Sequence, residues 1–366
     1  MGVGVGIALA IAAALILVYL WVRPALGGKP SAESRARIRR SKQYRDGVFA
    51  YPLPTPMIED WKEQLSILGD FIKGTPQAVP DRPLAVERYV PAPAEERGAS
   101  ARVTWFGHSA VLLELGERTV FLDPMLGRAP SPVPFVGGQR FKGSPPLDLQ
   151  ALPWLDAVVL SHDHYDHLDY PTILQLKEKT GTFIVPLGVA AHLERWGVAR
   201  EAIRECDWSE SVTLQGLTLT CAAARHFSGR GLFGRNSTLW CSWVIEGMGR
   251  RIFFSGDSGY GPHFRDIGET YGPFDLTLME CGQYDRRWAN IHMLPEETVQ
   301  AHQDVKGGLL VPIHWGAFRL AMHAWTDPVE RLLQAASVQG VAVCTPRIGE
   351  TVKLGQGEPP ATPWWR

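Results

Sequence analysis

Several side chains that commonly bind metals stand close together directly after an apolar run. The heptapeptide Ser161-His-Asp-His-Tyr-Asp-His follows four apolar residues that are typical of a buried strand. Residues two apart in an extended chain point to the same side, so His162 and His164 can share one ion. Asp166 and His167 fall in the following turn and can reach a second ion. Imidazole and carboxylate ligands without thiolate suit zinc, with iron or manganese as alternatives.

Three further candidates stand in the same relation to β-rich runs elsewhere in the chain. His226, Asp257 and His314 each follow such a run. Strand ends that meet at one edge of a sheet would bring all these side chains to one site. A carboxylate such as Asp257 can bridge two cations, because its two oxygens bind separately. Two-metal hydrolytic sites hold their ions about 3.5–4 Å apart, so we expect a binuclear centre with room for a shared hydroxide.

Alternating strand and helix patterns predict a layered α/β domain over residues 101–356, followed by a tail at 357–366. The β-rich runs are 102–106, 110–115, 119–122, 157–160, 182–185, 211–221, 242–246, 251–254, 276–279 and 308–312. Helical patterns fall at 171–178, 188–195, 295–305 and 328–336.

The N-terminal segment predicts a membrane anchor. Residues 2–22 carry no charge, and a helix of this length spans about 30 Å, which matches the hydrocarbon core of a bilayer. Tyr19 and Trp21 stand at its end, where interfacial aromatic residues belong. Eight basic residues and one acid follow between Arg23 and Arg45. They place the large domain on the cytoplasmic side and should attract anionic lipid headgroups.

The alternative for residues 2–22 is a cleaved signal peptide that exports the protein, but a basic start and a clear A-x-A site are missing. Residues 23–100 are rich in charge, Pro and Gly, and we expect a basic juxtamembrane and Pro-rich linker there. Within this linker, residues 57–72 have a helical spacing that places Trp61, Leu65 and Leu68 on one stripe.

Composition excludes several classes of protein. The chain has 366 residues, of which 45% are hydrophobic, so it can bury a substantial core. Its net charge is -1 and the part after residue 45 is acidic, which disfavours a nucleic-acid partner. Five scattered cysteines without a CxxC pair indicate neither a disulfide framework nor a thiolate zinc site. The sequence leaves the oligomeric state open.

Eight segments, in order along residues 50–350, resemble the metallo-β-lactamase superfamily and, more closely, the N-acyl-phosphatidylethanolamine-hydrolysing phospholipase D family. They are Trp105-Phe-Gly-His-Ser-Ala, Phe121-Leu-Asp-Pro-Met, Arg128-Ala-Pro-Ser-Pro, Gln139-Arg-Phe, Leu160-Ser-His-Asp-His-Tyr-Asp-His-Leu-Asp, Phe254-Ser-Gly-Asp-Ser-Gly-Tyr, Asn290-Ile-His-Met-Leu-Pro-Glu-Glu and Ile313-His-Trp-Gly-Ala-Phe. The HxHxDH pattern alone specifies only the superfamily. The inserted Tyr165 and the segments around His292 and His314 narrow the resemblance.

The resemblance implies an αββα sandwich, here preceded by a transmembrane helix, with two zinc ions at one sheet edge. It implies that His162, His164 and His226 bind one zinc, that Asp166, His167 and His314 bind the other with Asp257 bridging, and that Tyr165 and His292 line the substrate groove. The implied reaction is hydrolysis of N-acyl-phosphatidylethanolamine-type phospholipids to N-acylethanolamine and phosphatidic acid by a metal-bridging hydroxide. Asp166 and Asp257 would be the catalytic carboxylates. No side chain declares itself as the general acid, and a metal-bound water or Asp166 could serve.

Three other functions remain open at this point. One is a metal-dependent lactonase, or another hydrolase of the same fold, acting on a soluble substrate such as a phosphorylated one. A β-lactam hydrolase fits an inward-facing domain less well. A membrane-tethered scaffold without activity would be expected to have lost ligands, and none of the seven is missing.

Several other residues have two readings. His108 could support a metal ligand or make only a structural hydrogen bond. Asp123 could orient a ligand histidine, as outer carboxylates do, or simply occupy a turn. Trp288 and Trp315 could form an apolar wall for acyl chains or pack in the core. The C-terminal Trp-Trp pair could rest on a membrane interface or dock on the domain.

Overall fold

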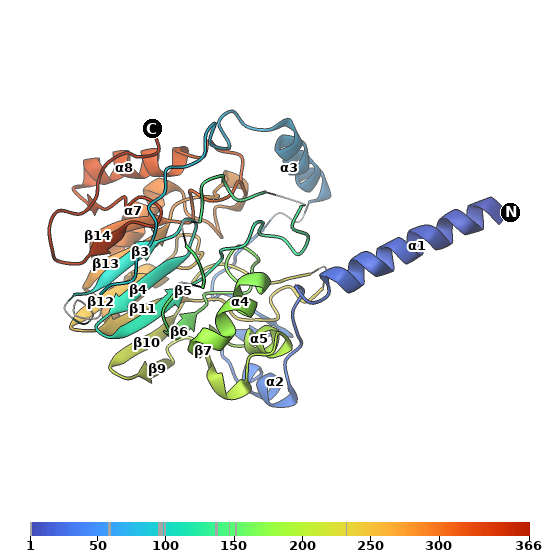
Figure 1. The fold of residues 1–366 in the computed structure, drawn as a ribbon, viewed down its shortest axis with the longest axis horizontal. Coiled ribbons are helices and arrows are strands. Elements are labelled where there is room, and N and C mark those ends of the chain that lie inside the picture. The colour runs from blue at the N-terminus through green and yellow to red at the C-terminus, as the bar shows by residue number, and fades with distance from the viewer. Residues whose placement is uncertain are drawn as a thin grey trace.

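Two seven-stranded sheets pack face to face, and helices cover their outer faces (Figure 1). The computed structural model describes residues 2–57, 60–93, 98, 100–135, 138–145, 147–150, 152–231 and 233–366. This arrangement is the predicted αββα sandwich.

The first sheet has the strand order β16-β3-β4-β5-β6-β7-β8. Its strands are β3 (Arg102–Trp105), β4 (Val111–Leu115), β5 (Arg118–Leu122), β6 (Leu155–Val159), β7 (Thr180–Pro186), β8 (Ile203–Cys206) and β16 (Thr351–Lys353). The strands β5 to β8 run parallel, and α4 (Tyr170–Leu176), η1 (Lys177–Lys179), α5 (Ala190–Arg195) and η2 (Arg200–Ala202) connect them.

The second sheet has the order β15-β14-β13-β12-β11-β10-β9. Its strands are β9 (Ser211–Leu214), β10 (Leu217–Ala222), β11 (Ser242–Gly247), β12 (Arg250–Phe254), β13 (Phe274–Glu280), β14 (Gly307–Ile313) and β15 (Ala342–Val343). Here β12 to β15 are parallel, and the connecting segments hold α6 (His263–Tyr271), η3 (Arg286–Trp288), α7 (Pro295–Asp304) and α8 (Asp327–Gln339). The run 211–221, predicted as one strand, is a hairpin, because Gln215 and Gly216 both have positive φ and turn the chain between β9 and β10.

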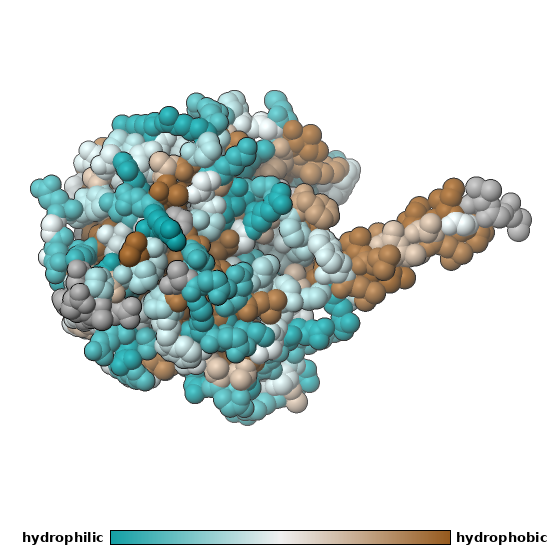
Figure 2. Space-filling model, in the orientation of Figure 1, coloured by the Kyte–Doolittle hydropathy of each residue, from teal (hydrophilic) through white to brown (hydrophobic). Residues whose placement is uncertain are grey.

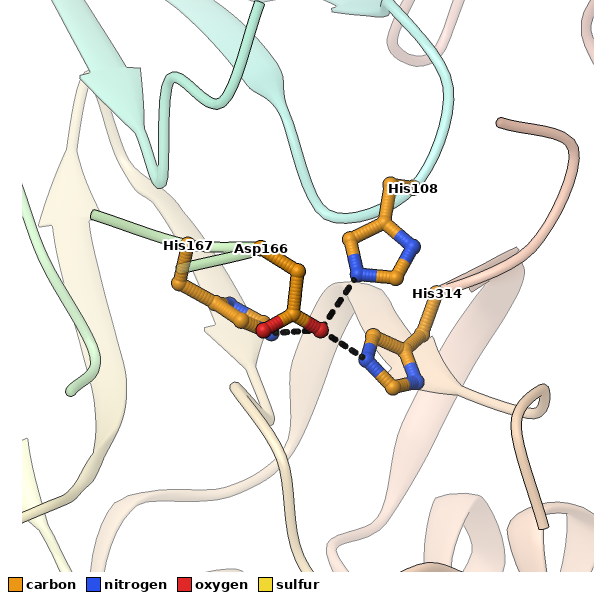
Figure 3. A group of neighbouring side chains, drawn as sticks. All are labelled: His108, Asp166, His167 and His314. Atoms are coloured by element: carbon orange, nitrogen blue, oxygen red, sulfur yellow. Dashed lines mark hydrogen bonds and ion pairs between the residues drawn. The ribbon is translucent and has the colours of Figure 1, made fainter. Parts of the chain in front are cut away.

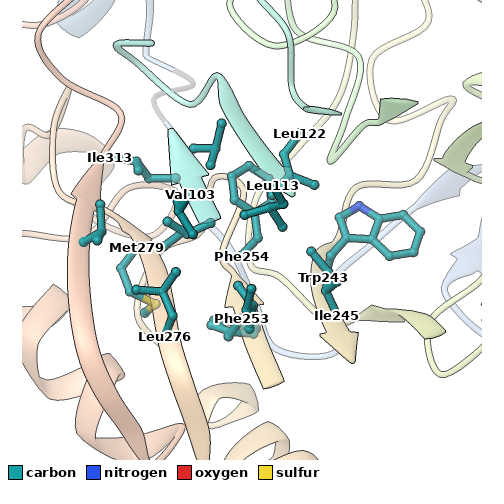
Figure 4. Packing of buried hydrophobic residues seen from close by; sticks show 14 of the residues in the cluster. Val103, Leu113, Leu122, Trp243, Ile245, Phe253, Phe254, Leu276, Met279 and Ile313 are labelled. Carbon is teal, nitrogen blue, oxygen red and sulfur yellow. The ribbon is translucent and has the colours of Figure 1, made fainter. Parts of the chain in front are cut away.

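Both faces of the first sheet are buried, because apolar side chains point alternately to its two faces along each strand. In β4, Leu113 joins the apolar cluster between the sheets and Leu112 joins the cluster under α4 and α5. Leu122 and Phe121 of β5 divide in the same way. Successive strand residues point to opposite faces, so one short strand supplies both layers. Figure 4 shows the inter-sheet cluster, in which Phe254 faces residues of the other sheet.

The N-terminal region contains α1 (Gly2–Val22), α2 (Ala32–Ile38), β1 (Tyr44–Arg45), β2 (Val48–Phe49) and α3 (Trp61–Lys73). Helix α1 projects away from the domain, and none of its 19 residues from Gly4 to Val22 is buried (Figure 1). By length and composition it suits a membrane anchor or a signal sequence equally. The structure thus has the predicted apolar helix, while its crossing of a membrane stays a prediction.

The region predicted as an extended linker packs against the sandwich at several points. Phe49 is fully buried in a cluster with Ile38 and Trp240. Leu84 belongs to the inter-sheet cluster, and its amide donates to the Lys142 carbonyl. Apolar contacts with strands far away in the sequence override the local Pro-rich composition, so much of this segment belongs to the folded domain.

The C-terminal tail also docks on the domain. Trp365 is buried, and the ring of Trp364 stacks on Trp315 at 5.4 Å. Trp315 in turn stacks on Trp105 and is 1% exposed, so it packs in the core rather than forming a wall for acyl chains.

Truncation of Phe49 should show that residues 23–100 take part in the cooperative fold. We expect Phe49→Ala to lower the free energy of unfolding by about 3–5 kcal/mol, because it removes a fully buried aromatic ring. The neighbouring Val48 is 38% exposed, and Val48→Ala should change stability by no more than about 0.5 kcal/mol. Denaturant unfolding of both variants in detergent measures the difference. Equal stabilities would mean that the segment is a linker after all.

Candidate metal centre

Three histidines from both sheets form the first group of candidate ligands. His162 and His164 follow the end of β6, and His226 follows β10. The Nδ1 atom of His164 lies 2.9 Å from His162 Nε2 and 3.2 Å from His226 Nε2. The candidate ligand atoms of all three therefore lie within 4.8 Å of one another, which is close enough to hold one ion. The structure brings together the residues that the resemblance assigns to one metal.

A second group surrounds Asp166, as Figure 3 shows. The Oδ2 atom of Asp166 lies 3.5 Å from His314 Nε2 and 3.6 Å from His167 Nε2. These are the three residues assigned to the other metal. His108 joins this group, because its Nε2 lies 3.0 Å from the same carboxylate oxygen. His108 is buried and contacts a candidate ligand directly, so of its two readings the structure favours support of the ligand Asp166.

The carboxylate of Asp257 lies between the two groups. Its Oδ2 is 3.1 Å from His314 Nε2 and 3.8 Å from the Nε2 atoms of both His162 and His226. Its Oδ1 is 3.1 Å from His167 Nε2. One side chain thus contacts members of both groups, which is the position that a bridging ligand requires.

The chemistry of the donors fits a pair of divalent cations. His167 Nε2, Asp257 Oδ1 and His314 Nε2 are buried and make no hydrogen bond. Buried polar atoms without partners are rare and call for a reason. Nitrogen and carboxylate oxygen atoms aimed at a common point supply that reason, because this donor set is typical of zinc and iron sites. The residues present therefore fit two metal ions.

Protonation of the histidines follows their surroundings. Burial and neighbouring imidazoles hold the pKa of His162 well below its ordinary value, and burial does the same for His226 despite the nearby Asp257. Both are neutral, which is the form that binds a metal. Burial also opposes protonation of His314, but Asp257 and Asp166 outweigh it and raise its pKa to about 10. These carboxylates would attract a metal cation in the same way.

Outer contacts fix the orientation of the candidate ligands. Asp123 Oδ2 lies 2.6 Å from His167 Nδ1, and its Oδ1 accepts a hydrogen bond from the Ser161 amide at 2.7 Å. His226 Nδ1 lies 2.9 Å from the Ile291 carbonyl. Such partners select the tautomer that presents Nε2 to a metal. Of the two readings of Asp123, the structure favours the one in which it orients a ligand histidine.

Sequence reasoning missed Glu280, which is fully buried beside the centre. Its Oε2 lies 2.8 Å from His292 Nδ1, and its Oε1 accepts hydrogen bonds from the amides of Ser258 and Met293. Burial raises the pKa of the Glu280 carboxyl. Glu280 is the last residue of β13, in the same relation to a strand as Asp257 and His314, and that position was the signal for it.

Tyr165 and His292, both predicted to bind substrate, occupy different places. His292 lines the cavity over the metal centre, while Tyr165 directs its hydroxyl to the Arg230 carbonyl at 2.6 Å. Tyr165 is not among the described residues that line this cavity. Its ring lies under the Arg230 guanidinium at 4.0 Å, so its observed contacts stabilise the metal-binding loop. Substrate binding by either residue stays a prediction.

Arg230 connects the metal-binding loop to the end of α1. Its Nη1 donates to the carbonyls of Asp163 and Leu168 at 2.6 and 2.8 Å, and its Nε and Nη2 donate to the Ala25 carbonyl. The Asp163 carboxylate, between two candidate ligands, accepts hydrogen bonds from Gly229 and Thr238. The loop that carries the HxHxDH pattern is therefore held from several sides.

The cavity over the centre has a volume of about 220 Å³ and is lined by both polar and apolar side chains. The polar lining, called the floor below, consists of His164, Asp166, Asp257, His292, His314 and Gln283, and the apolar lining, called the rim, consists of Met57, Phe227, Trp288, Ile291 and Leu320. Trp288, unlike Trp315, thus takes the position predicted for an apolar wall. The arrangement can hold a polar, negatively charged group at the metals and apolar chains at the rim.

Comparisons with known proteins agree with this geometry. Residues 118–315 match a family model described as a beta-lactamase superfamily domain. An uncharacterised protein of Mycobacterium tuberculosis is 45% identical over 94% of this chain and 92% of its own length. The N-acyl-phosphatidylethanolamine-hydrolyzing phospholipase D 1 of Caenorhabditis elegans is 35% identical over 63% of this chain and 68% of its own length.

A solved structure of a metallo hydrolase from the archaeon Ignicoccus hospitalis shares the fold, with a TM-score of 0.54 and 22% identity over 70% of this chain and all of that chain. The resemblance found in the sequence is thereby confirmed. The chain belongs to the β-lactamase superfamily of metal-dependent hydrolases, within the family that includes the N-acyl-phosphatidylethanolamine-hydrolysing phospholipases D.

Proposed function

We propose that this chain is a binuclear zinc phosphodiesterase that hydrolyses N-acyl-phosphatidylethanolamine-type phospholipids to N-acylethanolamine and phosphatidic acid. The observation that carries a two-metal reaction is the contact of Asp257 with both groups of histidines. The printed name of the Caenorhabditis elegans relative supports the lipid substrate. The apolar rim of the cavity supports it independently, since a soluble substrate does not need one.

Seven residues would hold the metals. We assign His162, His164 and His226 to one ion, Asp166, His167 and His314 to the other, and Asp257 to both. Zinc ions in such a site would lower the pKa of bound water and stabilise negative charge on phosphoryl oxygens. Iron or manganese could bind to the same ligand atoms. The supporting observation is that each group gathers its ligand atoms within 4.8 Å.

The protein side chains would position and neutralise the substrate. The rim residues Trp288, Ile291 and Leu320 would pack against the acyl chains while the phosphodiester enters the polar floor. Glu280 holds His292 through Nδ1, which leaves Nε2 to bond a substrate oxygen. Burial raises the pKa of Asp166, but His167, His108 and His314 outweigh it and hold that pKa well below the ordinary value. Asp166 is therefore a carboxylate at neutral pH, which is the form that binds a metal.

A phospholipid substrate lies in a bilayer, and a membrane anchor would hold the protein beside it. We propose that α1 crosses the bilayer once and that the basic flank keeps the domain on the cytoplasmic side. The charge-free α1, which has no buried residue over Gly4–Val22, supports this placement. Export by a signal sequence is the competing outcome, and protease accessibility of the domain in intact cells would distinguish the two.

Product analysis tests the substrate directly. Incubation of the purified, metal-quantified protein with N-acyl-phosphatidylethanolamine in mixed micelles should give N-acylethanolamine and phosphatidic acid in equal amounts by lipid mass spectrometry. A phosphorylated lactone serves as the comparison substrate. Faster turnover of the lactone, with no lipid products, would favour a soluble-substrate hydrolase on the same metal site.

Substitution of Asp257 tests the binuclear centre. Asp257→Asn keeps the shape but removes the anionic oxygen pair, so we expect metal content to fall from two ions towards one per chain. Turnover should fall by more than about 100-fold, since even outer contacts to ligands are worth 10–100-fold. Asp266→Asn, at an exposed position of α6, is the control. Normal metal load and activity in Asp257→Asn, or full activity after exhaustive chelation, would contradict the two-metal site.

Substitution of Asp123 tests its action through His167. Asp123→Asn weakens the acceptor for His167 Nδ1 and should reduce metal affinity by about 10–100-fold. Competition with a chelator measures the affinity, and excess zinc should restore activity. The exposed Asp148→Asn provides a matched control. An activity loss that zinc does not relieve would show a structural role for Asp123 instead.

A further inference from the structure

Helix α3 exposes an apolar stripe that nothing in the described part of the chain covers. Its 13 residues include none that is buried. The stripe consists of Trp61, Leu65, Leu68 and Ile72, each more than half exposed, with Ile72 at 79%. The spacing predicted one helical face for Trp61, Leu65 and Leu68, and the structure turns that face outward (Figure 2). A helix of this length is marginal in water without packing, so the stripe calls for a partner.

Among the described residues, the domain contacts α3 through Asp70 and Phe71, which lie off the stripe. Arg287 Nη1 lies 2.9 Å from Asp70 Oδ2, and Arg319 Nη2 donates to the Phe71 carbonyl at 3.0 Å. The Arg319 guanidinium also lies 4.6 Å from the centre of the Phe71 ring. These contacts fix the orientation of the helix, so the apolar stripe is presented in one direction.

The same contacts place α3 at the rim of the metal cavity. Trp288 and Leu320 follow Arg287 and Arg319 directly, and both line that cavity. Met57, which precedes α3 by a few residues, lines it as well. Helix α3 therefore lies beside the lining of the metal cavity.

Helix α1 leaves the domain on the same side. In Figure 1, α3 lies at the level along the long axis of the molecule where α1 meets the domain. The last turn of α1 contacts the domain through Trp21, whose ring stacks on Phe135 at 5.8 Å. Phe135 is itself 73% exposed. Exposed aromatic residues at a helix end are typical of a membrane interface.

We propose that the stripe of α3 docks on the surface of the lipid bilayer that α1 enters, with Trp61, Leu65, Leu68 and Ile72 in the interfacial layer. The proposal rests on the membrane placement of α1 in the proposed function. Its partner is the bilayer because the stripe is apolar, uncovered and level with the exit of α1, as an interfacial amphipathic helix would be. Docking would place the apolar rim of the metal cavity against the lipid surface, so a phospholipid could enter without crossing water.

Depth measurements on the full chain test the docking without any assay of activity. The five native cysteines are buried, so a nitroxide can be attached selectively at Leu65→Cys. Ser66→Cys, exposed beside the stripe, is the matched control. In vesicles of phosphatidylcholine and phosphatidylglycerol, the label at 65 should be more accessible to oxygen and less accessible to a water-soluble nickel chelate than the label at 66.

Two results would overturn the proposal. Equal accessibility of both labels would leave the stripe in water. Spin–spin broadening between labels at 65 would show that a second copy of the chain covers the stripe. Either result is obtained whether or not the chain hydrolyses a phospholipid, so failure of docking is distinguishable from failure of the proposed function.

A substrate comparison tests the consequence of docking. Leu65→Ser combined with Leu68→Ser should reduce hydrolysis of vesicle-embedded lipid by about tenfold or more, because it removes apolar area from the interface. Hydrolysis of a water-soluble short-chain phosphodiester should not change. Val338→Ser, at an 84% exposed position of α8, should leave both rates unchanged. Unchanged vesicle hydrolysis in the double variant, or equal loss on both substrates, would contradict docking by α3.

Discussion

The carboxylate of Asp257 forms the contact on which the sandwich and its site both depend. Asp257 follows β12 of the second sheet, whereas His162 and His167 follow β6 of the first. Their side chains meet only when the two sheets pack face to face over the inter-sheet apolar cluster. A buried carboxylate is costly without opposite charge, so the packing of the sheets and the gathering of the histidines or metals around Asp257 have to occur together.

Much of the centre could be predicted because each candidate ligand carries a local signal. His162, His164, Asp166 and His167 follow one strand pattern within a few residues, and His226, Asp257 and His314 repeat the strand-then-ligand order. Parallel neighbours in a sheet end at the same edge, so this repetition predicts a common site even without knowledge of the strand order. The αββα layers followed from the resemblance and from the interleaved patterns, and the structure confirms them.

Other features depend on contacts that no local pattern contains. Phe49 and Leu84 stand in a Pro-rich region, and only the distant strands they pack against make them part of the core. Glu280 is the last residue of β13, whereas Asp257 follows β12, and a glutamate inside an apolar run without a histidine beside it is a weak local signal. Tyr165 was assigned from the resemblance alone, and its bond to the Arg230 carbonyl depends on a loop 65 residues away. Helical spacing predicted the stripe of α3 but could not show which way it faces.

Arg230 connects the segment after α1 to the metal-binding loop. One guanidinium bonds the Ala25 carbonyl just beyond α1 and the Asp163 carbonyl inside the metal-binding loop. A second link runs from the Gly28 amide to His192 and on to the Asp163 carboxylate. A flexible tether would let the domain rotate freely over a membrane and face lipid only part of the time. With the end of α1 bonded to the loop itself, the direction of α1 and the direction of the metal cavity are set by the same few bonds.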